Sequence, residues 1–193
     1  MAHHFFAYLS RMKLIRRWGL MRNIRTENIQ EHSLQVAMIA HCLAVVGNQR
    51  FGRTLNPERV ALLGIYHEAS EVITGDLATP IKYFNPKIKQ AYKEIEAIAN
   101  EKLLSMLPDD MRVTYRSLLF PGEADREAEI LVKAADRICA WLKCVEELKA
   151  GNHEFEKAER SVYARIREME LPEAEYFLAE FAPGYRLTLD ELN

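Results

Sequence analysis

The stretch NIQEHSLQVAMIAHCLAVVG, from Asn28 to Gly47, has the clearest helical pattern in the chain. Its apolar residues recur every three or four positions, which is the spacing of an α-helix with one buried face. Asn28 is typical of an N-cap, with Glu31 three residues later, and Gly47 is typical of a helix end. We therefore expect a helix over residues 28–47 whose buried face consists of Ile29, His32, Val36, Ile39, Ala40 and Leu43.

The same helical spacing continues on both sides of this stretch. Asparagine–proline pairs at 56–57 and 85–86 are typical helix starts, with proline in the first turn. We expect further helices near residues 5–18, 57–75, 86–107, 125–150, 153–169 and 174–181, with a turn-rich segment at 109–122. No stretch alternates apolar and polar residues as a half-buried strand does. The sequence predicts an all-α fold, a single helical-bundle-like domain over residues 1–193.

Charge and cysteine content narrow the class of protein. The 193 residues include 26 lysines and arginines and 28 aspartates and glutamates, so the net charge is −2. This balance gives no reason to expect a nucleic-acid polymer or a membrane as partner. The most apolar run, residues 36–46, is far shorter than the roughly 20 residues that span a bilayer. Cys42, Cys139 and Cys144 lie in apolar helical stretches and predict reduced thiols in a cytoplasmic protein.

Four polar residues interrupt the apolar faces of three expected helices. They are His32, the pair His67 and Glu68, and Asp136. A buried imidazole or carboxylate is costly unless it is paired or bound to a metal. Any one of them alone is most simply a satisfied buried polar group. Together, two imidazoles and two carboxylates form a plausible four-ligand nitrogen and oxygen site, so the sequence predicts a divalent metal centre.

Other polar groups lie near this set in the sequence. Glu71 follows His67 by four residues, which would place both on one helical face. It could support His67, act as a general acid or base, or pair with a surface cation. The segment at residues 75–82 supplies a carboxylate, a hydroxyl and an amine. Arg17 and Trp18 are either a phosphate contact and a base or sugar wall, or a solvated charge and a core residue.

These patterns together resemble the HD-domain metal-dependent phosphohydrolases. The signature of that superfamily is a histidine, then a His-Asp pair on a later helix, then a distant aspartate, and here it reads His32, His67-Glu68 and Asp136. The resemblance is closer to the bacterial HD-domain 5′-deoxynucleotidases and covers nearly the whole chain. It is carried by FFAYLSRMKLIRRW (5–18), TEN with EHSLQVA (26–37), SEVITGD (70–76), TPIKYF (79–84) and LKCVEEL (142–148).

The resemblance implies an activity and a role for each matching residue. The family converts deoxyribonucleoside 5′-monophosphates to deoxynucleosides with a divalent metal, prefers deoxyribose to ribose, and is typically a homodimer. His32, His67, Glu68 and Asp136 would ligate the metal, and Glu71 would transfer a proton. Arg17 would contact phosphate, and Trp18 would exclude the ribose 2′-hydroxyl. The full set expected to face substrate is Arg17, Trp18, His32, Glu68, Asp76, Leu77, Ala78, Thr79, Lys82 and Asp136.

Glu68 departs from the family pattern, which has aspartate after the second histidine. The glutamate side chain is longer by one carbon–carbon bond, about 1.5 Å. Glutamate is still an oxygen ligand, so the change bears on metal choice and on the placement of the attacking water. The ligand set suits Co, Mn, Ni, Fe or Zn and does not select one.

Two other functions are compatible with the sequence. The first is an HD phosphohydrolase that acts on nucleoside triphosphates or signalling nucleotides, which would need more cationic groups near the site. The second is a metal-free helical interaction module descended from an enzyme, which the change at Glu68 would permit.

Overall fold

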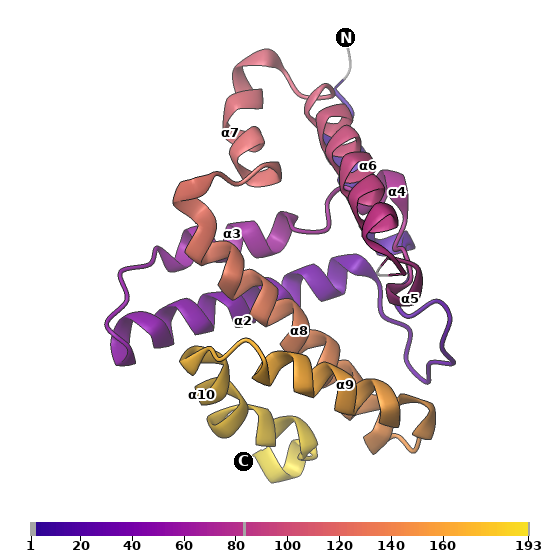
Figure 1. The fold of residues 1–193 in the computed structure, drawn as a ribbon, viewed down its shortest axis with the longest axis vertical. Coiled ribbons are helices and arrows are strands. Elements are labelled where there is room, and N and C mark those ends of the chain that lie inside the picture. Colours follow the sequence, from indigo (N-terminus) through magenta and orange to yellow (C-terminus); the bar gives the residue numbers. More distant parts are fainter. Residues whose placement is uncertain (1–2, 83, 193) are drawn as a thin grey trace.

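Two long helices cross at the centre of the molecule, α2 (Ile29–Arg50) and α8 (Arg126–Lys149) (Figure 1). The computed structural model describes residues 3–82 and 84–192, except for the side chain of Thr79. A third helix, α3 (Pro57–Tyr66), packs along α2 and also contacts α8. The fully buried core lies between these three helices and includes Val36, Leu43, Val60, Leu63, Ile138 and Leu142. The all-α prediction is confirmed, since the described residues contain no strand, only an isolated bridge between Arg16 and Asn28.

Helix α2 begins where the sequence predicts and ends later. The Asn28 side chain accepts hydrogen bonds from the backbone N–H groups of Gln30 and Glu31, both at 3.0 Å. The expected end at Gly47 is wrong, because the helix continues to Arg50. Gly47 is buried within it, where an added Cβ would lie 3.0 Å from the Glu173 carboxylate. This glycine therefore serves close packing and does not end the helix.

A second glycine brings α3 against α2. A Cβ added at Gly64 would lie 2.8 Å from Cα of Ala37, closer than real Cβ atoms approach a backbone. Only glycine permits this contact. As a result, the end of α3 lies next to the N-terminal half of α2, which carries His32.

The predicted helix over residues 57–75 is broken in the structure. Helix α3 ends at Tyr66, residues 67–70 form turns, and α4 (Glu71–Thr74) and α5 (Thr79–Lys82) follow as short separate helices. The His67 side chain takes part in this break. Its Nδ1 lies 2.7 Å from the Gly64 carbonyl oxygen, the acceptor that the N–H of residue 68 would use in a continuing helix.

A second, smaller core lies beside α3. It is formed by residues from α1 (Phe5–Leu9), α6 (Pro86–Leu104) and α7 (Asp109–Leu119), and η1 (Ser10–Leu14) connects α1 to the site. The expectation of turns at 109–122 is wrong for most of that segment, because α7 is helical. Met111, Tyr115 and Leu119 are spaced four residues apart and face this core, whereas most other α7 residues are exposed.

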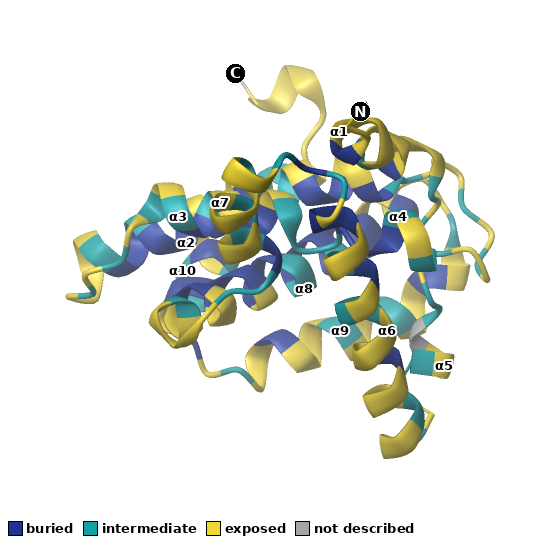
Figure 2. Ribbon diagram, turned by 90° about the horizontal axis from the view of Figure 1, so that it is seen from above, coloured by how far each residue is buried: buried dark blue, intermediate teal, exposed yellow. Residues whose placement is uncertain are grey.

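Segments on either side of α8 complete the fold, and those from η3 to η4 pack against α8 or α2. They are η2 (Glu123–Asp125) before α8, then η3 (His153–Phe155), α9 (Glu156–Arg167), α10 (Pro172–Glu180), η4 (Ala182–Arg186) and η5 (Leu189–Leu192). Figure 2 shows burial concentrated where α2, α3 and α8 meet, with exposed residues along much of α6. Within the described ranges, no helix is long and apolar enough to cross a membrane.

Candidate metal centre and active site

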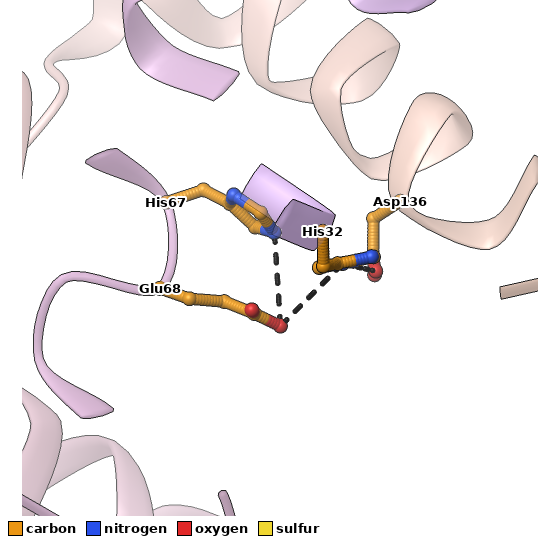
Figure 3. A group of neighbouring side chains, drawn as sticks. All are labelled: His32, His67, Glu68 and Asp136. Atoms are coloured by element: carbon orange, nitrogen blue, oxygen red, sulfur yellow. Dashed lines mark hydrogen bonds and ion pairs between the residues drawn. The ribbon is translucent and has the colours of Figure 1, made fainter. Parts of the chain in front are cut away.

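Four side chains from separate segments meet at one point beside the central core. His32 comes from α2, His67 and Glu68 from the turn that follows α3, and Asp136 from α8. One ligand atom from each lies within 4.8 Å of the others, and the four groups point toward one another (Figure 3). The structure therefore brings together all four residues that the sequence predicts as metal ligands.

His32 is fully buried, and its Nε2 faces the other members of the group. This nitrogen lies 3.0 Å from Oδ1 of Asp136 and 3.7 Å from Oε1 of Glu68. Desolvation opposes the ionisation of Asp136, but the hydrogen bond from His32 and the positive charge of Arg17 lower its pKa below the usual range. Asp136 is therefore a carboxylate at neutral pH.

His67 is held in the tautomer that a metal ligand needs. Its Nδ1 donates to the Gly64 carbonyl, which can only accept, so Nε2 carries the free lone pair. Nε2 is buried, faces Glu68 at 3.7 Å, and has no hydrogen-bond partner in the part of the chain that the structure describes. Burial lowers the pKa of His67, which keeps the imidazole neutral.

These donors fit a divalent metal ion. Two imidazoles and two carboxylates are the donor types that first-row transition metals take. Glu68 Oε2 is buried and has no hydrogen-bond partner among the described residues, a costly state that an ion would relieve. The longer side chain of Glu68 thus still reaches the group with Oε1, despite the departure from the family's aspartate.

Arg17 lies beside this group and is not a solvated surface charge. Its Nη1 donates to Oε2 of Glu27 at 2.7 Å. Its Nε lies 3.9 Å from Glu68 and its Nη2 lies 3.8 Å from Asp136. Burial alone would lower the pKa of Arg17, but the Glu68, Glu27 and Asp136 carboxylates raise it above its ordinary value. The cation thus presents one edge of its guanidinium to the predicted metal ligands.

Trp18 is half-buried at the edge of the same site. Its indole N–H donates to Oε2 of Glu27 at 3.2 Å, and its ring packs against Phe155 at a centroid separation of 5.4 Å. The residue has a φ of 59°, in the left-handed region that bulky side chains seldom adopt. These contacts are compatible with both interpretations of Trp18 from the sequence, a wall against the sugar and a core residue. Both interpretations stay predictions.

Glu71 is buried at the start of α4, with 5% of its surface exposed. Because the helix breaks after Tyr66, the expectation that Glu71 and His67 share one helical face is wrong. Burial, together with the negative charges of Glu68 and Asp76, raises the pKa of Glu71 to about 9. A carboxyl group in this environment holds a proton at neutral pH.

The segment after α4 borders the site, with different contacts at each position. Asp76 is exposed and its charge acts on Glu71. Leu77 and Ala78 are half-buried between α4 and α5, and the side chain of Thr79 lies outside what the structure describes. Lys82 donates to Glu96 on α6 at 2.9 Å and lies 4.6 Å above the Tyr92 ring. The substrate contacts expected from these residues stay predictions.

Sequence reasoning missed Glu27, which touches two of the expected substrate residues. The signal was present in the TEN motif at residues 26–28, but no role was derived for it. Lys143 and Glu147, within the LKCVEEL motif, were likewise given no role. Both are buried residues of α8. Their side chains form hydrogen bonds with the loop that contains Arg17 and Trp18, and these bonds attach the loop to α8.

Comparisons with known proteins agree with this arrangement. The family model described as "5'-deoxynucleotidase YfbR-like" matches residues 4–185. The chain is 58% identical over 190 residues to a 5′-deoxynucleotidase of Vibrio cholerae, covering 98% of both chains. It is 55% identical over 190 residues to a 5′-deoxynucleotidase of Yersinia pestis, covering 98% of this chain and 96% of the relative.

Two solved structures share the fold. An HD-domain phosphohydrolase from Listeria innocua matches with a TM-score of 0.82 and 25% identity, covering 95% of this chain and 88% of that one. A cyanophage S-2L HD phosphohydrolase, bound to dA and one catalytic Zn²⁺ ion, matches with a TM-score of 0.63 and 17% identity over 92% and 95% of the two chains. The second likeness supports the fold alone.

Proposed function

Because this chain belongs to the YfbR-like 5′-deoxynucleotidase family, we propose that it hydrolyses deoxyribonucleoside 5′-monophosphates to deoxynucleosides and phosphate with the help of a divalent metal ion. The observation that carries the proposal is the group of His32, His67, Glu68 and Asp136, with ligand atoms within 4.8 Å of one another. Arg17 and Glu71 beside it supply a phosphate contact and a proton.

The four grouped residues would hold the ion. When bound, the ion supplies a Lewis acid that makes water a better nucleophile and offsets the charge of the phosphate. The donor set admits Co, Mn, Ni, Fe or Zn. The Zn²⁺ of the cyanophage protein is a property of that protein.

Arg17 is suited to bind the phosphate of the substrate. Its Nη1 is engaged by Glu27, but Nε and Nη2 lie 3.9 and 3.8 Å from carboxylates, which is beyond hydrogen-bond distance. This free edge can donate two parallel hydrogen bonds to phosphate oxygens. The arginine would also offset negative charge as the phosphorus–oxygen bond breaks.

Glu71 is suited to protonate the leaving group. As water adds to phosphorus, the bond from phosphorus to the 5′-oxygen breaks and that oxygen gains charge. A protonated Glu71 would donate its proton there and yield the 5′-hydroxyl of the deoxynucleoside, and a proton from the attacking water would then return to Glu71 as the phosphate is released. Its raised pKa, about 9, means that this proton is present at neutral pH.

The contacts of Lys82 favour a monophosphate over a longer phosphate chain. A triphosphate or a signalling nucleotide with several phosphates needs further cations near the site. Lys82 is hydrogen-bonded to Glu96, whereas Arg17 directly faces the predicted metal ligands. Trp18 as a barrier to the 2′-hydroxyl, and residues 76–79 as nucleotide contacts, are part of the same proposal.

Phosphate release from a nucleotide panel tests the proposal. We expect the purified protein to hydrolyse dAMP faster than AMP, and both faster than dATP. Exhaustive chelation should abolish the activity, and addition of Mn, Co or Zn should restore it. Undiminished activity after chelation, or preferred hydrolysis of dATP, would contradict it.

Several related expectations stay predictions. They are a homodimer, a cytoplasmic location, a single domain over residues 1–193, and the absence of a nucleic-acid polymer as partner.

A further inference from the structure

The residues between Arg16 and Asn28 form a closed loop, here called the site loop. At its two ends, the Arg17 N–H donates to the Glu27 carbonyl at 2.9 Å, and the Ile29 N–H donates to the Ile15 carbonyl at 3.0 Å. The loop therefore leaves the segment that follows η1 and enters α2 through paired backbone. Arg17 and Trp18 lie on one side of this pairing and Glu27 on the other.

The Glu27 side chain joins three residues of the site. One oxygen, Oε2, accepts from both Arg17 Nη1 at 2.7 Å and Trp18 Nε1 at 3.2 Å. The other oxygen, Oε1, lies 3.9 Å from the buried Nδ1 of His32, which has no hydrogen-bond partner among the described residues. Glu27 is itself 12% exposed, so little water competes for these contacts.

Trp18 needs such restraint because its backbone is strained. Its φ of 59° is unfavourable for a bulky side chain and persists only where surrounding contacts hold it. Two backbone contacts contribute, since its carbonyl accepts from the Met21 N–H at 2.9 Å and from the Asn23 side chain at 3.2 Å. Neither of these contacts orients the indole ring, whereas the hydrogen bond to Glu27 does.

The far side of the site loop is attached to α8. Glu147 accepts from the backbone N–H groups of Ile24 at 2.9 Å and Arg25 at 3.2 Å, and Lys143 donates to the Arg25 carbonyl. Lys143 and Glu147 follow Asp136 by seven and eleven residues, so all three lie on one face of α8. The site loop is thus held in a fixed position relative to a predicted metal ligand.

We propose that Glu27 is a positioning residue that sets the distance between the phosphate contact of Arg17 and the sugar wall of Trp18, and so determines the preference for deoxyribose. The inference rests on the proposed function. In any one bound conformation of a 5′-nucleotide, the phosphate and the 2′-carbon lie at a fixed distance from each other. A single oxygen that holds both side chains therefore places the indole where a 2′-hydroxyl would clash.

The two tryptophans of the chain allow the contact itself to be measured without metal or substrate. Trp18 donates to Glu27, whereas Trp141 donates to Glu159 at 2.8 Å. In ¹H–¹⁵N spectra of the metal-free protein, Glu27→Gln should shift the indole N–H resonance of Trp18 and leave that of Trp141 in place. Glu159→Gln is the matched control and should do the reverse.

Sugar selectivity is the second readout. An apolar pocket discriminates against a substrate with one added hydroxyl by roughly 100-fold. We therefore expect the ratio of kcat/KM for dAMP to kcat/KM for AMP to fall at least about 10-fold in Glu27→Ala at saturating metal. Glu27→Gln keeps an acceptor and should give an intermediate ratio. Glu159→Gln should keep the wild-type ratio. General damage to the fold would lower both rates and leave the ratio unchanged.

Two results would overturn the inference. One is an unchanged ratio in Glu27→Ala, or in Glu27→Gln if the alanine variant does not fold. The other is an unshifted Trp18 resonance in Glu27→Gln. If the wild-type protein releases no phosphate from deoxynucleotides, the proposed function and the sugar preference both fail, while the spectra still report whether Glu27 holds Trp18.

Discussion

The two sides of the site are built differently. On one side, His32 and Asp136 project from long helices on faces that continue into the buried core, and α3 is brought against α2 by Gly64. On the other side, Arg17 and Trp18 lie in the site loop, where backbone pairing and carboxylate hydrogen bonds replace helical packing.

From this difference we infer that one side controls metal binding and the other controls substrate selection. Core packing sets the positions of the predicted metal ligands, so substitutions there should change metal binding first. Hydrogen bonds set the positions of Arg17 and Trp18, so substitutions in the site loop should change substrate selection while the metal stays bound. The predictions below test whether the two sides can be separated in this way.

Removal of Asp136 should have the largest effect. Asp136→Ala takes away one predicted ligand and the hydrogen-bond partner of His32. We expect loss of most bound metal and at least about a 1,000-fold fall in turnover, since a catalytic ion supplies several kcal/mol of transition-state stabilisation. Metal content by elemental analysis and phosphate release measure the two effects.

The matched control on this side is Glu68→Asp, which keeps a carboxylate and restores the residue usual in the family. It should retain both ion and activity, although the preferred metal can change. Wild-type metal content in Asp136→Ala would show that the ion is held elsewhere. Glu68→Ala should lose most of the metal, and full retention would remove Glu68 from the ligand set.

Glu71→Gln should have the next largest effect and separates proton transfer from metal binding. Glutamine keeps the size of the buried side chain but cannot deliver the proton. We expect turnover to fall at least about 100-fold, the lower limit for general acid–base catalysis, with metal content and dAMP binding unchanged. Single-turnover kinetics and equilibrium binding measure these separately. If the variant loses its metal, Glu71 supports the ligands instead.

The smallest effect on the site is expected from substitution of Glu147. This residue binds the far side of the site loop, at Ile24 and Arg25. Burial opposes its ionisation, but hydrogen bonds from Lys143, Asn152 and the N–H groups of Ile24 and Arg25 lower the pKa of Glu147 to about 2. Glu147→Gln should reduce the free energy of unfolding at pH 7 by about 1–3 kcal/mol, as expected for hydrogen bonds to a buried charge. Metal content should stay at the wild-type value.

The pH dependence gives an independent check. Because the folded pKa lies below the ordinary value of 4.5, Glu147 stabilises the folded state fully above about pH 4.5, and this contribution is lost as the pH falls toward 2. Urea unfolding should therefore show a difference between wild type and Glu147→Gln that shrinks over this range. Exposed Glu146 provides the control, since Glu146→Gln should change neither stability nor its pH dependence. A constant difference from pH 7 to pH 3 would contradict the assignment.

The helix N-caps were predicted correctly from the sequence. Asn28, Asn56 and Asn85 each begin a helix, and each side chain accepts backbone N–H groups of the first turn. The apolar spacing predicted the central helices because their buried faces are continuous. It failed at α7, where few residues are buried, and at residue 47, where glycine serves packing between distant segments.

The sequence by itself determined the helical class, the starts of α2, α3 and α6 and the identities of the chemical groups, because each depends on residues within a few turns of one another. The tertiary structure alone decided that α3 ends at Tyr66, that His32 meets Asp136 across 104 positions of the chain, and that Glu27 holds Arg17 and Trp18 together. These outcomes depend on how helices far apart in sequence pack. That packing is set by the close contact at Gly64 and by hydrogen bonds between distant segments, which no local pattern reveals.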